Sequence, residues 1–193
     1  MIIRLAVVTL LIFLGVGPGT KAPHFHTGGN VMVTGKTLKI DASGHELKVE
    51  LAPQGAAMRL GSLSELTPGQ EVIAIGTLSR HGFILKRIVM AQKFRKIFLE
   101  GMGKWERMKC RWKVGTLTSI FPVKLRTDDA DEELPLGTAT RVFLPLDIKD
   151  IKPGDEIAAA GERTKEGLFK AVFILVGPGA REVLPPGPHA LSP

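Results

Sequence analysis

The chain has 193 residues and a formal net charge of +7, and 44% of its residues are hydrophobic. This length suits one large domain or two small ones, and the hydrophobic content excludes a disordered chain. A single cysteine excludes an internal disulfide and any cysteine-built zinc or iron–sulfur site, while 22 glycines and 13 prolines predict a packed protein that is rich in turns.

The N-terminus carries an uninterrupted apolar run at positions 5–16. A membrane-spanning helix needs about 20 apolar residues, so this shorter run has the length expected of a secretory signal peptide. Thr20 and Ala22 are small enough for a cleavage site, but Pro23 would follow the cleaved bond. We interpret residues 1–22 as a signal peptide or an N-terminal membrane anchor, and we predict that the protein is extracytoplasmic, in the periplasm or at the cell surface.

One segment occurs twice within the chain. Residues 62–76 read SLSELTPGQEVIAIG and residues 147–161 read DIKDIKPGDEIAAAG. When the two are aligned, the Pro-Gly pairs coincide, and so do the final glycines, Gly76 and Gly161. Each copy also opens alike, with VTGKTLKI at residues 33–40 and VGTLTSI at residues 114–120. This agreement indicates an internal duplication.

Each copy consists of short runs rich in Val, Ile, Leu and Thr, separated by glycine, proline and acidic turns, which predicts strands. In each Pro-Gly turn the proline presets φ, and we expect Gly69 and Gly154 to take the positive φ of a type II turn. About five short strands in about 70 residues, with a helical turn at residues 62–66, are typical of a small OB-like Greek-key barrel. The predicted fold is all-β: two tandem OB-like Greek-key barrels behind an N-terminal signal or anchor segment.

The pattern of strand, turn, strand, short helical turn, K/T-P-G-D/Q-E-V/I and G-x(5)-G covers residues 30–177. It resembles exported bacterial domains of unknown function that carry tandem OB-like barrels. That resemblance implies an extracytoplasmic binding or structural role and carries over no catalytic residue. The chain is also similar to the periplasmic haem chaperone of cytochrome c maturation, which implies a haem-attaching role for His189 in the tail.

The repeat and the composition predict five segments along the chain. They are a signal peptide or anchor, a first OB-like barrel, a basic junction, a second OB-like barrel and a Pro/Gly-rich tail. We place them at residues 1–22, 30–92, 93–106, 107–177 and 178–193. The composition of the last segment predicts an extended arm.

Positive charge is concentrated around the junction. Residues 86–113 contain ten cations and two anions, whereas the rest of the chain has a net charge of −1. We therefore predict that this region contacts an anionic partner, either a protein or an anionic polymer. The predicted binding residues are Lys93, Arg95, Lys96, Lys104, Arg107, Lys109, Arg111 and Lys113.

Two structures compete for this region. Apolar residues recur at helical spacing between Phe94 and Trp112, which favours an amphipathic helix, although two glycines near its middle each cost about 1 kcal/mol there. Strict alternation over residues 107–114 favours a strand that exposes its four cations and buries Met108, Cys110 and Trp112 against the second barrel. That stripe could follow a polyanion or could be a solvated strand edge protected by its charges. We expect residues 94–98 to pack on their own barrel as a final strand or a hinge helix.

Other candidate sites have weaker motifs. His24 and His26 alternate after the leader, but two ligands are too few for a metal site, so flexible or surface histidines are favoured. The acidic run at residues 128–133 lacks the spacing of a calcium loop and is interpreted as a solvated hairpin tip. No Gly-x-Ser-x-Gly, His-Glu-x-x-His, Walker or dinucleotide fingerprint occurs.

These observations predict a non-enzymatic exported binding or structural protein of the cell envelope or of a larger assembly, with no cofactor. One alternative is a module that binds single-stranded nucleic acid or another polyanion, which the stripe favours and the leader disfavours. Another alternative is a metal or haem carrier that uses His24, His26 or His189.

Overall fold

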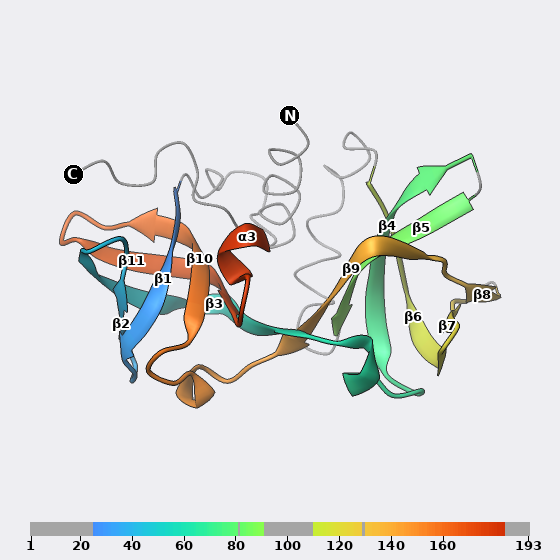
Figure 1. Ribbon diagram of the computed structural model, residues 1–193, viewed down its shortest axis with the longest axis horizontal. Helices are drawn as coiled ribbons and strands as arrows, with labels where there is room; N and C mark the ends of the chain where they lie inside the picture. Colours follow the sequence, from blue (N-terminus) through green and yellow to red (C-terminus); the bar gives the residue numbers. More distant parts are fainter. Residues whose placement is uncertain (1–24, 81, 91–109, 129, 184–193) are drawn as a thin grey trace. The chain divides into compact units, whose positions relative to one another are not determined.

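The computed structural model describes residues 25–80, 82–90, 110–128 and 130–183, and strands make up most of this chain (Figure 1). The strands are β1 (Phe25–Val33), β2 (Leu38–Asp41), β3 (Glu46–Gly61), β4 (Glu71–Ser79), β5 (Gly82–Met90), β6 (Cys110–Ile120), β7 (Val123–Arg126), β8 (Asp131–Glu133), β9 (Leu136–Pro145), β10 (Glu156–Arg163) and β11 (Leu168–Val176). The described helical segments are η1 (Leu63–Glu65), η3 (Ile148–Asp150) and α3 (Ala180–Val183). The prediction of an all-β protein is confirmed.

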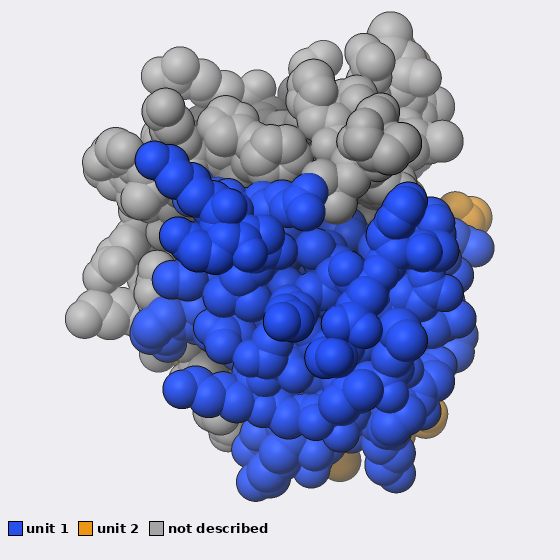
Figure 2. All heavy atoms as spheres, turned by 90° about the vertical axis from the view of Figure 1, so that its left-hand side faces the viewer, with its two compact units in different colours: residues 1–60, 145–193 blue, residues 61–144 orange. Residues whose placement is uncertain are grey.

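The described residues form two compact units. Unit 1 contains residues 25–60 and 145–183, and unit 2 contains the described residues between 61 and 144. Figure 2 shows unit 1 in blue as one continuous packed body. The predicted barrel boundaries, 30–92 and 107–177, do not coincide with these units. The chain passes from one unit into the other at the ends of β3 and β9.

Unit 1 is a closed barrel of five strands. Strand β1 pairs antiparallel with β2 and with β10, while β2 pairs with β3 and β10 with β11. A parallel pairing between β11 and β3 closes the ring. The side chains that fill its interior include Leu38, Ile40, Val49, Phe169 and Ile174, each at most 1% exposed.

The strand order of unit 2 resembles that of unit 1 in part. Strand β4 pairs antiparallel with β5 and β6, β6 pairs with β7, and β7 pairs with β8. Strand β5 pairs in parallel with β9, as β11 does with β3 in unit 1. The interior of this unit is built from side chains such as Val72, Leu85, Ile88, Leu117 and Leu125.

The repeated segments adopt the same local structure. The Pro-Gly glycines Gly69 and Gly154 both have φ of 92°, which confirms the predicted positive φ. Each donates its backbone N–H to a neighbouring strand, to the carbonyl oxygen of Leu117 at 2.8 Å and of Val31 at 2.7 Å respectively. Register shifts occur immediately before the equivalent glycines of β4 and β10. The two Pro-Gly turns are therefore hydrogen-bonded to equivalent strands, β6 in unit 2 and β1 in unit 1.

Each unit combines strands from both copies of the repeat. The β4–β5 hairpin begins within the first copy of the repeated segment, yet it pairs with β6 and β9, which precede the second copy. Conversely, the β10–β11 hairpin begins within the second copy and pairs with β1 and β3. The two halves of the chain thus exchange their closing hairpins, which is why neither predicted barrel is a compact unit.

Candidate partner-binding surface

The structure describes two of the eight predicted binding residues, Arg111 and Lys113, and both lie on β6 of unit 2. The other six lie outside the described residues: Lys93, Arg95, Lys96, Lys104, Arg107 and Lys109. The described part of the candidate surface is therefore β6 and the strands beside it.

The two sides of β6 follow from its pairing with β4. Lys113 lies opposite Ala74, a core residue, whereas Trp112 lies opposite Ile75 on the outer side of the sheet. Side chains alternate along a strand, so Arg111 and Lys113 share the side that carries buried Leu117. The prediction that Trp112 is buried against the barrel while Lys113 lies on an exposed face is therefore wrong, because Lys113 lies on the side of the core and Trp112 on the other side. Both are partly buried: Trp112 lies beside buried Ile75 on the outer side of the sheet, and Lys113 beside buried Ala74 on the interior side.

Lys113 is held by two neighbours rather than left free. Its Nζ forms an ion pair with a carboxylate oxygen of Glu132 and lies 5.4 Å from the centroid of the Phe83 ring. A cation over an aromatic face gains roughly 0.5–2 kcal/mol, more as water is excluded. Phe83 is 5% exposed, and its ring lies against Gly76, where an added Cβ would come within 2.8 Å of Phe83 Cζ. The positive charge of Lys113 is therefore compensated within the protein itself.

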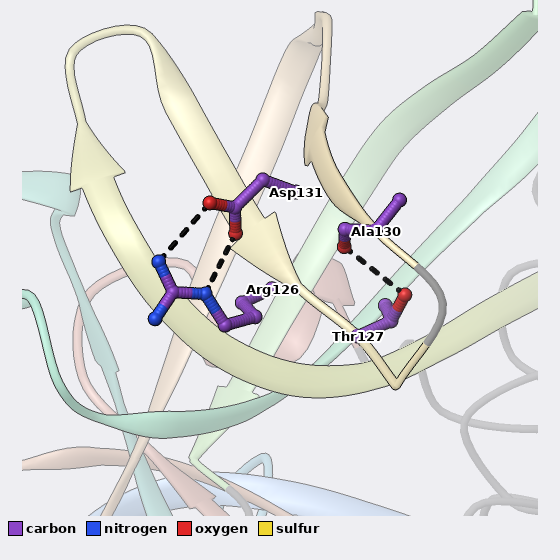
Figure 3. Close-up of polar contacts among 4 residues, drawn as sticks. All are labelled: Arg126, Thr127, Ala130 and Asp131. Atoms are coloured by element: carbon purple, nitrogen blue, oxygen red, sulfur yellow. Dashed lines mark hydrogen bonds and ion pairs between the residues drawn. The ribbon is translucent and has the colours of Figure 1, made fainter.

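The acidic run beyond β7 pairs with that strand. Arg126 donates from Nε and from one terminal nitrogen to the two carboxylate oxygens of Asp131, both at 3.1 Å (Figure 3). The hydrogen bond from Arg126 lowers the pKa of Asp131, and the bond to Asp131 raises the pKa of Arg126. Lys124 lies directly opposite Glu133 in the same register. The acids thus balance the cations of β7.

The predicted hairpin tip at residues 128–133 therefore includes a paired strand, β8. Thr127 closes the turn, since its N–H and its hydroxyl both donate to the carbonyl oxygen of Ala130, at 2.9 and 3.2 Å (Figure 3). Glu132, the ion-pair partner of Lys113, is not among the predicted site residues. A usable signal was present: VKLR at residues 123–126 alternates apolar and basic, and the acids after the turn match its cations.

Arg111 is the exposed cation at the start of β6. Within the described chain it takes part in none of the ion pairs, in contrast to Lys113 and Arg126. The described residues of unit 1 carry ten cations and ten anions, and those of unit 2 carry eight and six. Residues 91–109 carry six cations and two anions, so most of the excess positive charge adjoins Arg111 in the sequence.

Metal ligands do not cluster in the described chain. No group of three or more His, Cys, Asp or Glu side chains there could hold a metal ion. His45 is exposed, whereas His24, His81 and His189 lie outside the described residues, as do the side chains of His26 and Cys110. The predicted alternatives that use those histidines are therefore not addressed by the described geometry.

No protein-family model, curated protein or solved structure matches this chain. Between residues 25 and 183, in the parts that the structure describes, no helix has the length and apolar content needed to cross a membrane.

Proposed function

We propose that the chain is an exported, non-enzymatic binding or structural protein of the cell envelope or of a larger assembly, and that it contacts an anionic partner through residues 93–113. One observation carries this proposal: both units are close to charge balance, while the segment between β5 and β6 carries a net charge of +4. A protein whose excess charge is confined to one segment attracts anions there.

We also propose that each unit is an OB-like barrel, so that the protein contains two. The support is the strand order. In each unit one strand of a hairpin pairs antiparallel with the first strand of an antiparallel run. The other hairpin strand pairs in parallel with β3, the third strand of the run in unit 1, and with β9, the strand that follows the run, in unit 2. Closed barrels leave few unpaired strand edges, which suits a module that binds through its surface.

The N-terminal segment supports an extracytoplasmic location. Its apolar run, at positions 5–16, is shorter than a spanning helix and is preceded by Arg4. Intact mass and fractionation of the native protein test this part of the proposal. Removal of residues 1–22, or their retention together with recovery in the membrane fraction, is expected, and an uncleaved chain recovered with the cytosol would contradict it.

Binding to defined polyanions tests the anionic partner. The full chain is titrated with polyphosphate and with a thymidine oligonucleotide of about 20 nucleotides at low salt, and then again after the six cations at positions 93–109 are replaced by glutamine. We expect the replacement to weaken binding of the polyanion at least tenfold. Release of counterions from contacted phosphates favours binding, and each phosphate that loses its contact keeps its counterions.

A matched control replaces six exposed cations of unit 1 with glutamine: Lys36, Lys48, Lys152, Arg163, Lys165 and Lys170. The control lowers the net charge by the same amount and should bind as the unchanged protein does. Equal loss in the two variants would mean that net charge alone governs binding and would contradict the proposal. Binding of the oligonucleotide without polyphosphate binding would select the nucleic-acid alternative.

A further inference from the structure

Two arginines lie directly opposite each other on neighbouring strands of unit 2. Arg87 of β5 is paired in register with Arg141 of β9, and parallel strands lie about 4.8 Å apart. Both arginines project from the side of the sheet that is opposite the core, since the residues next to them, Ile88 and Val142, belong to the core cluster. Arg141 is exposed. The two side chains therefore leave one outer surface from adjacent positions.

Such an arrangement is unfavourable without a counter-charge, because like charges directly opposite each other destabilise a sheet. Unit 1 has a comparable pair in Lys39 and Lys48, and there Glu46 forms an ion pair with Lys39 at 3.0 Å. Strands β5 and β9 contain no acidic residue that could act in the same way. An anion that belongs to neither strand would relieve the repulsion between the two arginines.

A lysine adjoins the pair. Lys86 precedes Arg87 and is the extra residue at the register shift between β4 and β5. Its Nζ lies beside Gly137 of β9, where an added Cβ would come within 2.8 Å of it. The ammonium group therefore borders the strand that carries Arg141.

A bulge in β9 positions Arg141. The four residues before it, 137–140, have no partner in the register of β5 and β9. The hydroxyl group of Thr140 closes this bulge, since it lies 3.0 Å from the carbonyl oxygens of both Leu85 and Gly137. The backbone next to Arg141 is thus held before a ligand binds, which lowers the entropy lost on binding.

The duplication provides an internal comparison. Phe173 of β11 occupies the place of Arg87, since it pairs with β10 and β3 as Arg87 pairs with β4 and β9. The strand registers give the other two equivalents in the same way. The three cations of unit 2 correspond to apolar residues of unit 1: Val172, Phe173 and Ala56. The barrel therefore forms without cations at these positions, and the positive cluster is particular to unit 2.

We propose that Arg87 and Arg141, with Lys86 beside them, bind a phosphate monoester. One arginine already satisfies both oxygens of a carboxylate, and a phosphodiester likewise has two free oxygens, whereas a phosphate monoester offers three to a pair of guanidinium groups. The monoester also carries a charge of about −1.5 to −2, which suits three cations. This site goes beyond the proposed function, since it uses none of residues 93–113, and the diester chain of a nucleic acid is not its ligand.

Titration of the full chain with methyl phosphate tests the site, and dimethyl phosphate serves as the diester control. Binding is followed by NMR of the arginine Nε–H groups. We expect methyl phosphate to shift the signals of Arg87 and Arg141, and dimethyl phosphate to bind about tenfold more weakly or worse. Equal affinity for the two esters, or unchanged signals of both arginines, would overturn the proposal.

Two double variants show whether the guanidinium groups are the cause. Arg87→Gln with Arg141→Gln should bind methyl phosphate at least tenfold more weakly and, because adjacent like charges are removed, should unfold at no lower temperature than the unchanged protein without ligand. Arg87→Lys with Arg141→Lys keeps the charge and loses the planar forks, so it should also bind more weakly. Affinity in the lysine variant equal to that of the unchanged protein would exclude recognition by two guanidinium groups.

A matched control replaces Lys48 and Lys170 with glutamine. They are exposed cations on β3 and β11, the unit 1 counterparts of β9 and β5, and their loss lowers the net charge equally. This control should bind methyl phosphate as the unchanged protein does, and an equal loss would overturn the proposal. The six-glutamine variant of residues 93–109 should also keep its affinity for methyl phosphate. Failure of the proposed polyanion contact and failure of this site are therefore observed separately.

Vesicles identify the source of the phosphate group. Phosphatidic acid presents a monoester and phosphatidylglycerol a diester, at the same mole fraction in phosphatidylcholine vesicles. Recovery of the protein with phosphatidic acid alone, lost in the glutamine variant, would assign the monoester to a lipid. Recovery with neither lipid, together with methyl phosphate binding, would assign it to a soluble molecule. Equal recovery with both lipids in the unchanged protein and in the glutamine variant would contradict selection of a monoester by the two arginines.

Discussion

Substitution of Gly161 by alanine provides a sharp test of the hairpin exchange. An added Cβ at Gly161 would lie 2.1 Å from the carbonyl oxygen of Lys170 and 2.8 Å from Ala171 Cα, whereas ordinary contacts are 3.4–4 Å. Both obstructing groups are backbone of β11, so the hairpin itself must shift. The equivalent glycine of β4, Gly76, meets the carbonyl oxygen of Ile84 at the same 2.1 Å.

Overpacking of a buried site costs about 1–3 kcal/mol, and a backbone obstruction belongs to the upper part of that range. A cost of about 2–3 kcal/mol speeds hydrogen exchange from the affected barrel about 30- to 150-fold, since each 1.4 kcal/mol is a factor of ten. Gly161→Ala should therefore loosen the partners of its hairpin, β1 and β3, although these strands come from the opposite end of the chain.

Hydrogen exchange resolved by peptide measures this effect, and Gly76→Ala is its reciprocal control. Gly76→Ala should speed exchange in β6 and β9 and spare β1 and β2. The opposite assignment, in which Gly161→Ala loosens β6 and β7 and leaves β1 protected, would refute the exchange of hairpins.

Two further predictions concern unit 1. In a Cys110→Ser background, the double variant Thr27→Cys/Ala159→Cys should form a disulfide, because Thr27 and Ala159 are paired across β1 and β10. The control Thr27→Cys/Ala74→Cys uses the equivalent position of β4 and should form none. The reverse result would contradict the strand pairing. Desolvation raises the pKa of Glu156, but hydrogen bonds from Arg181 and Gly179 outweigh it and lower the pKa below the usual 4.5. The carboxylate therefore stabilises α3 above pH 4.5, and this contribution is lost as the pH falls through the lowered pKa. Protection of the amides of residues 177–183, measured relative to their intrinsic exchange rates, should fall in acid. Glu156→Gln should show low protection at all pH values, and unchanged protection in that variant would exclude the role of Glu156.

The sequence predicts the local structure of the repeats well and the pairing of their strands poorly. The positive φ of Gly69 and Gly154 follows from turn chemistry, and so does the short helical turn before each glycine. The choice of partner strand does not, because the two hairpins are alike. The N–H of Gly69 bonds to Leu117, and nothing in the turn itself excludes the equivalent carbonyl of Val31, which Gly154 uses instead.

The candidate site shows a second limit of sequence reasoning. Alternation in β6 identifies two faces, but a rule that places the apolar face inside fails where both sides of a sheet carry buried apolar side chains. Trp112 lies beside Ile75 on the outer face, and Lys113 turns inward, where Glu132 and Phe83 compensate its charge. Glu132 belongs to β8, which follows Lys113 in the chain, and Phe83 belongs to β5, which precedes it. Only the three-dimensional pairing of strands brings them together.

The salt dependence of polyanion binding tests the central functional claim most directly. Six cations at positions 93–109 in contact with a flexible polyanion should give a slope of log K against log salt of about −4, since each contact contributes about −0.7. We expect this slope for the unchanged protein and for the unit 1 control, and a slope close to zero for the six-glutamine variant. A slope that is the same in all three proteins, or near zero in the unchanged protein, would contradict it.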